Sequence, residues 1–349
     1  MCNSVSGVPG APTLSTGQPP EPYRAADSRI AADSSAVDGG AVDGGAADGG
    51  AADGGAPGRR RGTSGPEGKR RPLEYPPAPE PLPVPVMDNH THLDFQDGTV
   101  QVSLSAALDA AEAAGVCGAV QVATDLESSR FTVAAVDLDA RLLGAIALHP
   151  NDAPALAEAG GLEAALTEIE ALAAHPRIRA IGETGLDYFR TPEEGRASQQ
   201  YSFRRHIDIA KRRSLALQIH DRDAHDDVVR TLKAEGAPER VVLHCFSGDA
   251  ELARICNENG WYMSFAGTMT FRNAQNLREA LLVADPGLVL VETDAPFLTP
   301  HPYRGQPNAS YMVPYTVRAM AAVLGADLAH LCTRIAENTR AVYGSWDAG

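Results

Sequence analysis

The sequence predicts a (β/α)8 barrel that follows a low-complexity N-terminal extension. Three observations favour this fold. Eight apolar runs, each followed by a helical pattern, occupy roughly 265 residues, which is the length that such a barrel needs. The runs are apolar on both faces, as in the strands of a buried parallel sheet. No GxGxxG motif follows the first run, which counts against an open doubly wound sheet, the alternative fold.

The predicted elements alternate along one barrel domain at residues 83–346. The strands are short runs rich in Val, Ile and Ala, at residues 86–92, 116–123, 142–150, 178–187, 215–220, 240–248, 261–267 and 287–298. The helices are Ala- and Leu-rich stretches at residues 104–115, 126–138, 162–175, 197–214, 223–236, 249–260, 272–284, 314–325 and 327–344. Each strand is therefore followed by at least one helix, as the barrel requires.

Residues 1–82 are predicted to be a disordered tail. The stretch AVDGGAVDGGAADGGAADGG repeats five residues of Gly, Ala and Asp and has almost no apolar surface to bury. The basic stretch RRRGTSGPEGKRR and the Pro-rich YPPAPEPLPVPV follow it. The basic stretch is either a solvated extension or a contact for nucleic acid or another acidic partner. Met87 leaves open an internal start of the biological chain.

Charge and cysteine content restrict the function. A formal net charge of -15 and a pI near 5.1 argue against a broad grip on duplex DNA, which needs a basic face. A narrow pocket for one phosphate end remains open, because metal ions can reverse the local field. The five cysteines include no CxxC pair, so neither a zinc knuckle nor a disulfide framework is indicated. The cysteine usage indicates a reducing cytosol, and no secretory signal or membrane-length apolar run is present. We therefore expect a cytoplasmic protein without membrane contacts, and we also expect a monomer.

Residues of metal-ligand type stand at the carboxyl ends of the predicted strands. They are His90, His92, Glu183, His220, His244 and Asp294. In a barrel these ends meet at one mouth. Singly, each histidine could be a half-buried side chain, Glu183 a helix cap and Asp294 an Asx turn. Together they would leave several buried polar groups unpaired without a cation, so the set predicts a metal site.

The number of ligands predicts two divalent cations. Four histidines and two carboxylates exceed one tetrahedral site and suit two ions about 3.5–4 Å apart. The two histidines of the first strand can share one ion with Asp294 on the adjacent eighth strand, while His220 and His244 hold the other. Glu183 is the candidate bridging ligand. Asp294 is also the best candidate for a general base that accepts a proton from the attacking water.

Five motifs in the same order carry a family likeness: DNHTHLD, GETGLDYF, LQIHDRDA, VVLHCFSG and ETDAPFLTP. Together they resemble the TatD family of metal-dependent hydrolases, a branch of the amidohydrolase-like barrels. The likeness covers about residues 86–345. It implies a cytoplasmic deoxyribonuclease that acts on DNA ends, often from the 3′ side, with Mg²⁺ or a similar ion such as Mn²⁺ or Zn²⁺. It also implies that the six residues above are the metal ligands.

Several further residues at the predicted mouth have two interpretations. Arg222 could clamp a non-bridging phosphate oxygen or pair with Asp221 or Asp223. His149 could donate a hydrogen bond to the substrate or only order its own loop. Arg304 lies in the loop after the eighth strand, where phosphate contacts are often built.

Asp187 and Asp94 could orient ligating imidazoles, although ordinary loop hydrogen bonds would explain them equally well. Tyr188 and Phe189 could stack on a base, with packing over the following helix as the favoured alternative. His206 stands where family members often have Gln, and we expect it on the surface of its helix.

The predicted function is metal-dependent hydrolysis of phosphodiester bonds at DNA ends. The alternative is hydrolysis of an ester, lactone or amide, because the same two-metal chemistry acts on carbonyl carbon. A basic or aromatic track at the mouth would distinguish them, and the sequence does not show one clearly. A barrel kept only for binding would have an incomplete ligand set, whereas all six residues are present.

Overall fold

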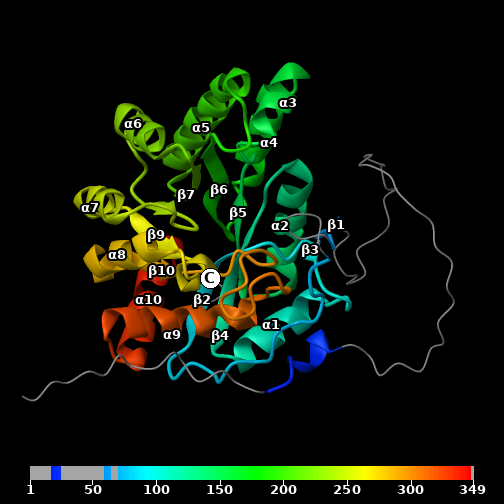
Figure 1. Cartoon of the computed structure of the whole chain (residues 1–349). Coiled ribbons are helices and arrows are strands. Elements are labelled where there is room, and N and C mark those ends of the chain that lie inside the picture. Colours follow the sequence, from blue (N-terminus) through cyan, green and yellow to red (C-terminus); the bar gives the residue numbers. More distant parts are fainter. Residues whose placement is uncertain (1–16, 25–58, 64–69, 347–349) are drawn as a thin grey trace, which may run out of the picture.

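The computed structural model describes residues 17–24, 59–63 and 70–346. Eight parallel strands form one sheet in the order β10-β9-β8-β7-β6-β5-β4-β2, with helices around it (Figure 1). The predicted barrel is thereby confirmed. Its strands are β2 (Val86–Thr91), β4 (Val116–Val122), β5 (Leu142–Ile146), β6 (Ile178–Asp187), β7 (Ala216–Arg222), β8 (Val241–Leu243), β9 (Tyr262–Phe265) and β10 (Val289–Val291). Its helices are α1 (Leu104–Ala113), α2 (Leu126–Leu138), α3 (Ala153–Glu158), α4 (Leu162–Leu172), α5 (Glu193–Arg213), α6 (His225–Glu235), α7 (Ala250–Asn259), α8 (Gln275–Val283), α9 (Val313–Leu324) and α10 (Leu328–Tyr343).

The ends of β2 and β10 close the barrel through backbone hydrogen bonds. Asp294 N donates to His90 O at 2.9 Å, and His92 N donates to Ala295 O at 2.8 Å. Thr91 forms a parallel bridge with Ala295. These bonds bring the residues that follow β10 beside the last residues of β2. They therefore bring the His-x-His pair next to Asp294.

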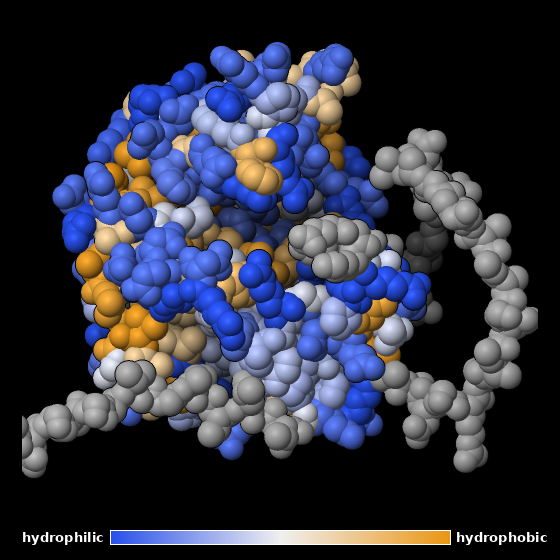
Figure 2. All heavy atoms as spheres, viewed as in Figure 1, coloured by the Kyte–Doolittle hydropathy of each residue, from blue (hydrophilic) through white to orange (hydrophobic). Residues whose placement is uncertain are grey.

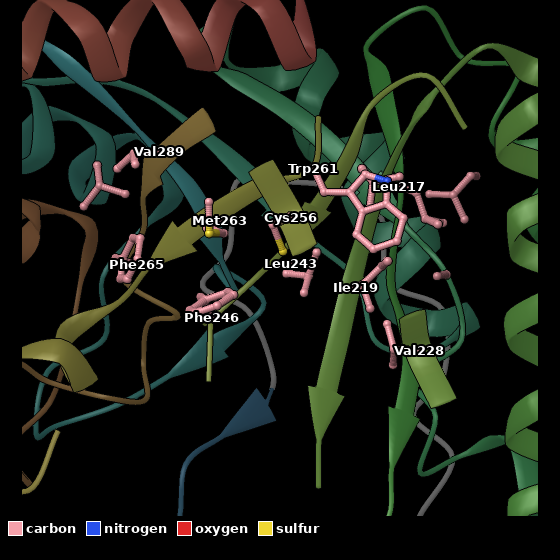
Figure 3. Close-up of a cluster of buried hydrophobic side chains, with 14 of the residues drawn as sticks. Leu217, Ile219, Val228, Leu243, Phe246, Cys256, Trp261, Met263, Phe265 and Val289 are labelled. Atoms are coloured by element: carbon pink, nitrogen blue, oxygen red, sulfur yellow. The ribbon is translucent and has the colours of Figure 1, made fainter. Parts of the chain in front are cut away.

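The core divides between the two faces of the pleated sheet. The larger cluster packs the strands against the surrounding helices, and Figure 3 shows part of it around Trp261 and Phe265. A second cluster takes alternate strand residues such as Leu143, Val242 and Leu290, and it includes Tyr343 from the end of α10. Because alternate residues of a strand point to opposite faces, we place this second cluster inside the barrel.

Polar caps begin several of the helices. Asp125 forms a capping box with Ser128 at the start of α2. Ser103, Asp249 and Asp327 accept hydrogen bonds from the first turns of α1, α7 and α10. Each such cap contributes about 1 kcal/mol. For α1, α2 and α7, these caps set where the loop after the preceding strand ends and the helix begins.

Parts of the N-terminal extension pack on the barrel, so the prediction of a disordered tail at residues 1–82 is wrong for residues 17–24, 59–63 and 70–82. Tyr23 and Tyr75 are buried in one cluster with Tyr311. Tyr311 Oη donates to Pro76 O at 2.6 Å. Composition averaged over the Gly-Ala-Asp repeats hides these few apolar side chains, which have enough surface to bury. Residues 1–16, 25–58 and 64–69 lie outside the described part of the chain.

The face of the molecule in Figure 2 is mainly hydrophilic, as expected of a chain with a formal net charge of -15. Within the described residues, no single helix has the length and apolar character needed to span a membrane. The sharply bent pair Ser310–Leu324 and Leu328–Tyr343 meets those criteria only when its two parts are taken together.

Candidate metal centre

The structure brings all six predicted ligands together at the carboxyl ends of the strands. His90, Glu183 and His220 lie in the C-terminal halves of β2, β6 and β7, whereas His92, His244 and Asp294 follow the ends of β2, β8 and β10. Most of their surface is buried. Three groups of side chains have ligand atoms close enough to share an ion: His90 with His244 and Asp294, His90 with His92 and Glu183, and His149 with Glu183 and His220. The groups overlap, so they form one continuous cluster.

Glu183 lies at the middle of this cluster. Its Oε1 is 2.7 Å from His220 Nδ1 and 2.9 Å from His244 Nε2. Its Oε2 is 3.7 Å from His90 Nε2 and 3.8 Å from His92 Nε2. One carboxylate oxygen therefore faces each half of the cluster, which is the arrangement expected of a bridging ligand.

The His-x-His pair and Asp294 form one half of the centre. The Nε2 atoms of His90 and His92 lie 3.2 Å apart. Asp294 Oδ1 is 3.3 Å from His92 Nε2 and 3.6 Å from His90 Nε2. His92 Nδ1 is 2.9 Å from Val122 O, so Nδ1 carries a proton and the ring directs Nε2 at the cluster. Two imidazole nitrogens and a carboxylate directed at one point fit a divalent cation.

The electrostatics of the cluster favour positive charge. Burial alone raises the pKa of Glu183, but the neighbouring imidazoles, His244 foremost, hold that pKa well below its usual range. Burial lowers the pKa of His92, but Asp294 outweighs it and raises the pKa to about 9. Burial also lowers the pKa of His244, but Glu183 and Glu292 outweigh burial and hold that pKa well above its ordinary value. A field that stabilises added protons also stabilises a cation at this place.

Two carboxylates orient the imidazoles of the other half. Asp187 Oδ2 is 3.2 Å from His220 Nε2, in agreement with the orienting role considered from the sequence. Glu292 Oε1 is 3.2 Å from His244 Nδ1 and accepts from Cys245 N at 2.7 Å. Glu292 is fully buried on β10's carboxyl side, and its role was not predicted. Its position two residues before Asp294, at the same strand end, is the feature of the sequence that could have indicated this role.

His149 belongs to the cluster more closely than predicted. We expected it to contact the substrate or to order its loop, and not to serve as a ligand. Its Nε2 lies 3.4 Å from Glu183 Oε1, and its Nδ1 accepts a hydrogen bond from Asn151 N at 3.1 Å. It is therefore a further candidate ligand, beside Glu183 and His220.

The remaining mouth residues differ in what they contact. Arg222 stacks on the Phe189 ring at 3.9 Å from its centroid, and Arg304 stacks on the Phe271 ring at 4.4 Å. Tyr188 packs over the following helices as favoured from the sequence, with its hydroxyl 2.7 Å from Asp227 Oδ2.

Asp94 and Asn308 have structural contacts. Asp94 accepts from Gln121 Nε2 at 3.1 Å and lies 3.6 Å from Arg59, so its contacts are not with a ligating imidazole. Asn308 is buried and donates to Thr293 O and Phe297 O at 3.0 and 2.5 Å. Asn308 thereby holds the loop after β10 in place.

His206 is buried, so the prediction of a helix-surface position is wrong. Its Nδ1 is 2.9 Å from Thr184 Oγ1, and its Nε2 accepts from Leu148 N at 3.3 Å. Burial lowers the pKa of His206 to about 3. The side chain links α5 to the ends of β5 and β6, directly behind Glu183.

Comparison with known proteins identifies the family. A family model described as "TatD related DNase" matches residues 87–344. The chain belongs to this family. It is 45% identical over 263 residues to the "Uncharacterized metal-dependent hydrolase TatD" of Mycobacterium tuberculosis, covering 74% of this chain and 98% of that protein. It is 35% identical to YabD of Bacillus subtilis, an uncharacterized metal-dependent hydrolase, with the same coverage of each chain.

A solved structure shows the same fold. The crystal structure of YjjV, a TatD homolog from Escherichia coli K12, matches with a TM-score of 0.66 and 25% identity, over 74% of this chain and 98% of that one. The family and the ligand cluster together make the protein a metal-dependent hydrolase of the TatD family. The extension before residue 87 lies outside the matched region.

Proposed function

We propose that this protein hydrolyses phosphodiester bonds at DNA ends, as a 3′–5′ exonuclease with two divalent cations. The observation that carries this proposal is the pair of Phe189 and Arg222 at the mouth. Phe189 is 63% exposed, and the Arg222 guanidinium lies 3.9 Å over its ring. An exposed aromatic ring can stack on any base, and a stacked arginine can bind the adjacent phosphate. A small neutral ester would need neither group.

The place of this pair in the fold supports the same substrate class. Phe189 follows Asp187 by two residues, and Arg222 follows His220 by two residues. Asp187 and His220 are hydrogen-bonded in the metal centre. Phe189 and Arg222 therefore stand at the ends of β6 and β7, the two strands that carry the candidate ligands Glu183 and His220.

The residues that would hold the cations follow from the distances above. His90, His92 and Asp294 would hold one ion, and His220 with His244 or His149 the other, with Glu183 between them. When bound, two such cations polarise the phosphoryl oxygens and lower the pKa of water. The imidazole donors suit Zn²⁺, whereas the carboxylate donors suit Mg²⁺ or Mn²⁺. The family resemblance implies Mg²⁺, and we propose Mg²⁺ as the first metal to test.

Asp294 is the proposed general base. Although burial raises the pKa of its carboxyl group, His92 and His90 lower it below its usual range, so the group is ionised near neutral pH. Its side chain is 14% exposed. An ionised, accessible carboxylate beside the ligand cluster can take a proton from an attacking water. All the groups that it needs come from one chain, in agreement with an active monomer.

The test uses protein freed of metal and single-stranded DNA labelled at its 3′ end, with Mg²⁺, Mn²⁺ or Zn²⁺ added separately. His90→Ala and Asp294→Ala are compared with the wild type. His330→Ala, an exposed histidine on α10, is the matched control. We expect stepwise, metal-dependent loss of 3′ nucleotides in the wild type and in the control, and its loss in the two site variants.

DNA that stays intact with every metal, while all the variants are folded, would refute the exonuclease proposal. In that case the alternative is a two-metal ester, lactone or amide hydrolase, and the same four proteins would be assayed on those substrates.

A further inference from the structure

Residues 59–63 of the extension bring positive charge to the mouth of the barrel. They form β1 (Arg59–Arg60), which pairs in parallel with β3 (Phe95–Gln96), the short strand that follows β2 (Figure 1). Residues 1–71 contain eight basic and eight acidic side chains, so the formal net charge of -15 resides on residues 72–349. Six of these eight basic residues fall between positions 59 and 71. Residues 59–63 thus place three arginines against an acidic barrel, beside its candidate metal centre.

Two arginines of this segment stack on two phenylalanines that flank His92. The Arg59 guanidinium lies 5.6 Å from the centroid of Phe95, and the Arg61 guanidinium lies 5.2 Å from that of Phe297. Both rings meet the His92 imidazole edge to face, with centroids 6.2 and 6.1 Å away. Residues i and i+2 of an extended segment point to the same side. One aromatic layer therefore separates both arginines from a candidate metal ligand.

Arg59 is already neutralised by acidic partners. Its Nη2 binds Asp125 Oδ2 at 2.5 Å and lies 3.6 Å from Glu127, while its Nη1 lies 3.6 Å from Asp94. Three carboxylates around one guanidinium leave little charge to attract an anion. Arg59 anchors the segment to the barrel.

Among the described residues, Arg61 has fewer acidic partners than Arg59. Its Nη1 donates to Pro296 O and lies 3.5 Å from Asp97 Oδ2, but Asp97 is also bound by the buried Arg71. A guanidinium has five N–H donors, so these two partners, taken among the described residues, leave several for a ligand. Burial and Arg71 lower the pKa of Arg61, while Asp97 and Asp294 act in the opposite direction, which places Arg61 within electrostatic range of the proposed general base.

We propose that Arg61 binds a non-bridging phosphate oxygen of the DNA strand held at the metal centre, and so sets the affinity for the substrate. This inference rests on the proposed function, because it requires a phosphodiester substrate. The planar guanidinium of Arg61 has a pair of N–H donors that matches two phosphate oxygens, and one of its faces stacks on the Phe297 ring. The extension, which lies outside the region that the family model matches, then completes the substrate site of this protein.

The test compares steady-state kinetics of the full-length, metal-loaded wild type with Arg61→Gln, Arg61→Lys and Arg60→Gln on a short single-stranded oligonucleotide. Arg60 is the matched control, because it belongs to the same segment, is exposed, and donates to Gly98 O at 2.7 Å. For Arg61→Gln we expect KM to rise about tenfold with kcat within about twofold, as for the loss of one charge-assisted hydrogen bond. Arg61→Lys should restore part of the affinity, and Arg60→Gln should change KM less than about twofold.

Salt dependence and stability separate this role from others. The slope of log KM against log salt concentration should fall by about 0.7 in Arg61→Gln, the value for one phosphate contact on a single strand. Metal content and thermal midpoint should match the wild type. Three results would each overturn the inference. They are a rise in KM in Arg60→Gln equal to that in Arg61→Gln, a loss of bound metal in Arg61→Gln, and a fall in the KM of Arg61→Gln, which would show that the segment inhibits binding.

The two proposals fail in different ways. Cleavage by the wild type with an unchanged KM in Arg61→Gln would overturn the role of Arg61 and leave the proposed function standing. No cleavage by the wild type with any of the metals would overturn both. Should Arg61→Gln fold poorly, Arg61→Lys decides the point, because Lys keeps the charge and a donor for Pro296 O but loses the planar fork. Unchanged KM and salt slope in a folded Arg61→Lys would exclude recognition by the fork.

Discussion

The buried histidine behind the metal centre should make the stability of this protein depend on pH. His206 is fully buried, and burial lowers its pKa to about 3, against 6.5 for an ordinary histidine. In the unfolded chain the side chain takes up a proton as the pH falls through about 6.5, whereas the folded protein does so only near pH 3. The unfolded state therefore binds more protons in this interval, and the free energy of unfolding falls as the pH falls.

The magnitude follows from the linkage between protonation and folding. One pH unit corresponds to about 1.36 kcal/mol for one group that is protonated only in the unfolded state. Between pH 6.5 and pH 5.0 His206 alone should thus lower the free energy of unfolding by about 2 kcal/mol. His206→Gln removes the titration, and its amide can keep one donor and one acceptor for the contacts with Thr184 and Leu148.

The assay is urea unfolding at pH 7.5 and at pH 5.0, followed by fluorescence of Trp261 and Trp346, with the same metal concentration throughout. The free energies of wild type and His206→Gln should differ by no more than about 1 kcal/mol at pH 7.5. From pH 7.5 to pH 5.0 the variant should gain about 2 kcal/mol relative to the wild type. His330→Gln, at an exposed position, should follow the wild type. An unchanged difference between wild type and His206→Gln at the two pH values would refute the reasoning.

Two further substitutions test the construction of the site. Glu292→Gln removes the charge behind His244 while keeping the shape, and Mn²⁺ affinity measured by calorimetry should fall about 10- to 100-fold, with the exposed Glu279→Gln unaffected. Gly185→Ala would place a Cβ 2.1 Å from the backbone oxygen of His220 at a φ of +140°. In urea unfolding, it should lower the free energy of unfolding by about 1–3 kcal/mol or more. The control is Gly160→Ala, where φ is also positive but the added Cβ meets no atom, and the loss there should be smaller. Equal losses in the two variants would rule out the close approach to His220 as the cause.

The barrel and the convergence of the six candidate ligands could be predicted because both depend on local sequence patterns. Strands that are apolar on both faces and followed by helices define a parallel barrel, and its geometry directs the strand ends to one mouth. Polar residues that interrupt such strands at their ends stand out, as His220 and His244 do. Glu292 was not recognised because a strand-end acid next to an obvious ligand has the same appearance whether it orients an imidazole or faces solvent.

The burial of His206 follows from its position on α5. On α5 the buried residues Gln199, Phe203, His206, Ile207 and Ala210 recur at the spacing of one helical face. A histidine on such a stripe faces the core, whatever its polarity suggests. Its burial is tolerated because two hydrogen-bond partners satisfy both ring nitrogens, and partners of this kind come from strands distant in the sequence.

The extension shows why composition alone does not decide whether a segment is ordered. Ordering a residue costs about 1–2 kcal/mol in backbone entropy, and the burial of apolar side chains must offset that cost. Tyr23 and Tyr75 differ from the Gly-Ala-Asp repeat because each can bury a large ring against Tyr311, and short segments around such anchors can pack on the barrel. Basic residues spaced i and i+2 then gain a fixed direction, as Arg59 and Arg61 do along β1 and just beyond it. A charge run in a low-complexity stretch acquires a specific position when its own backbone pairs with the fold, as β1 pairs with β3.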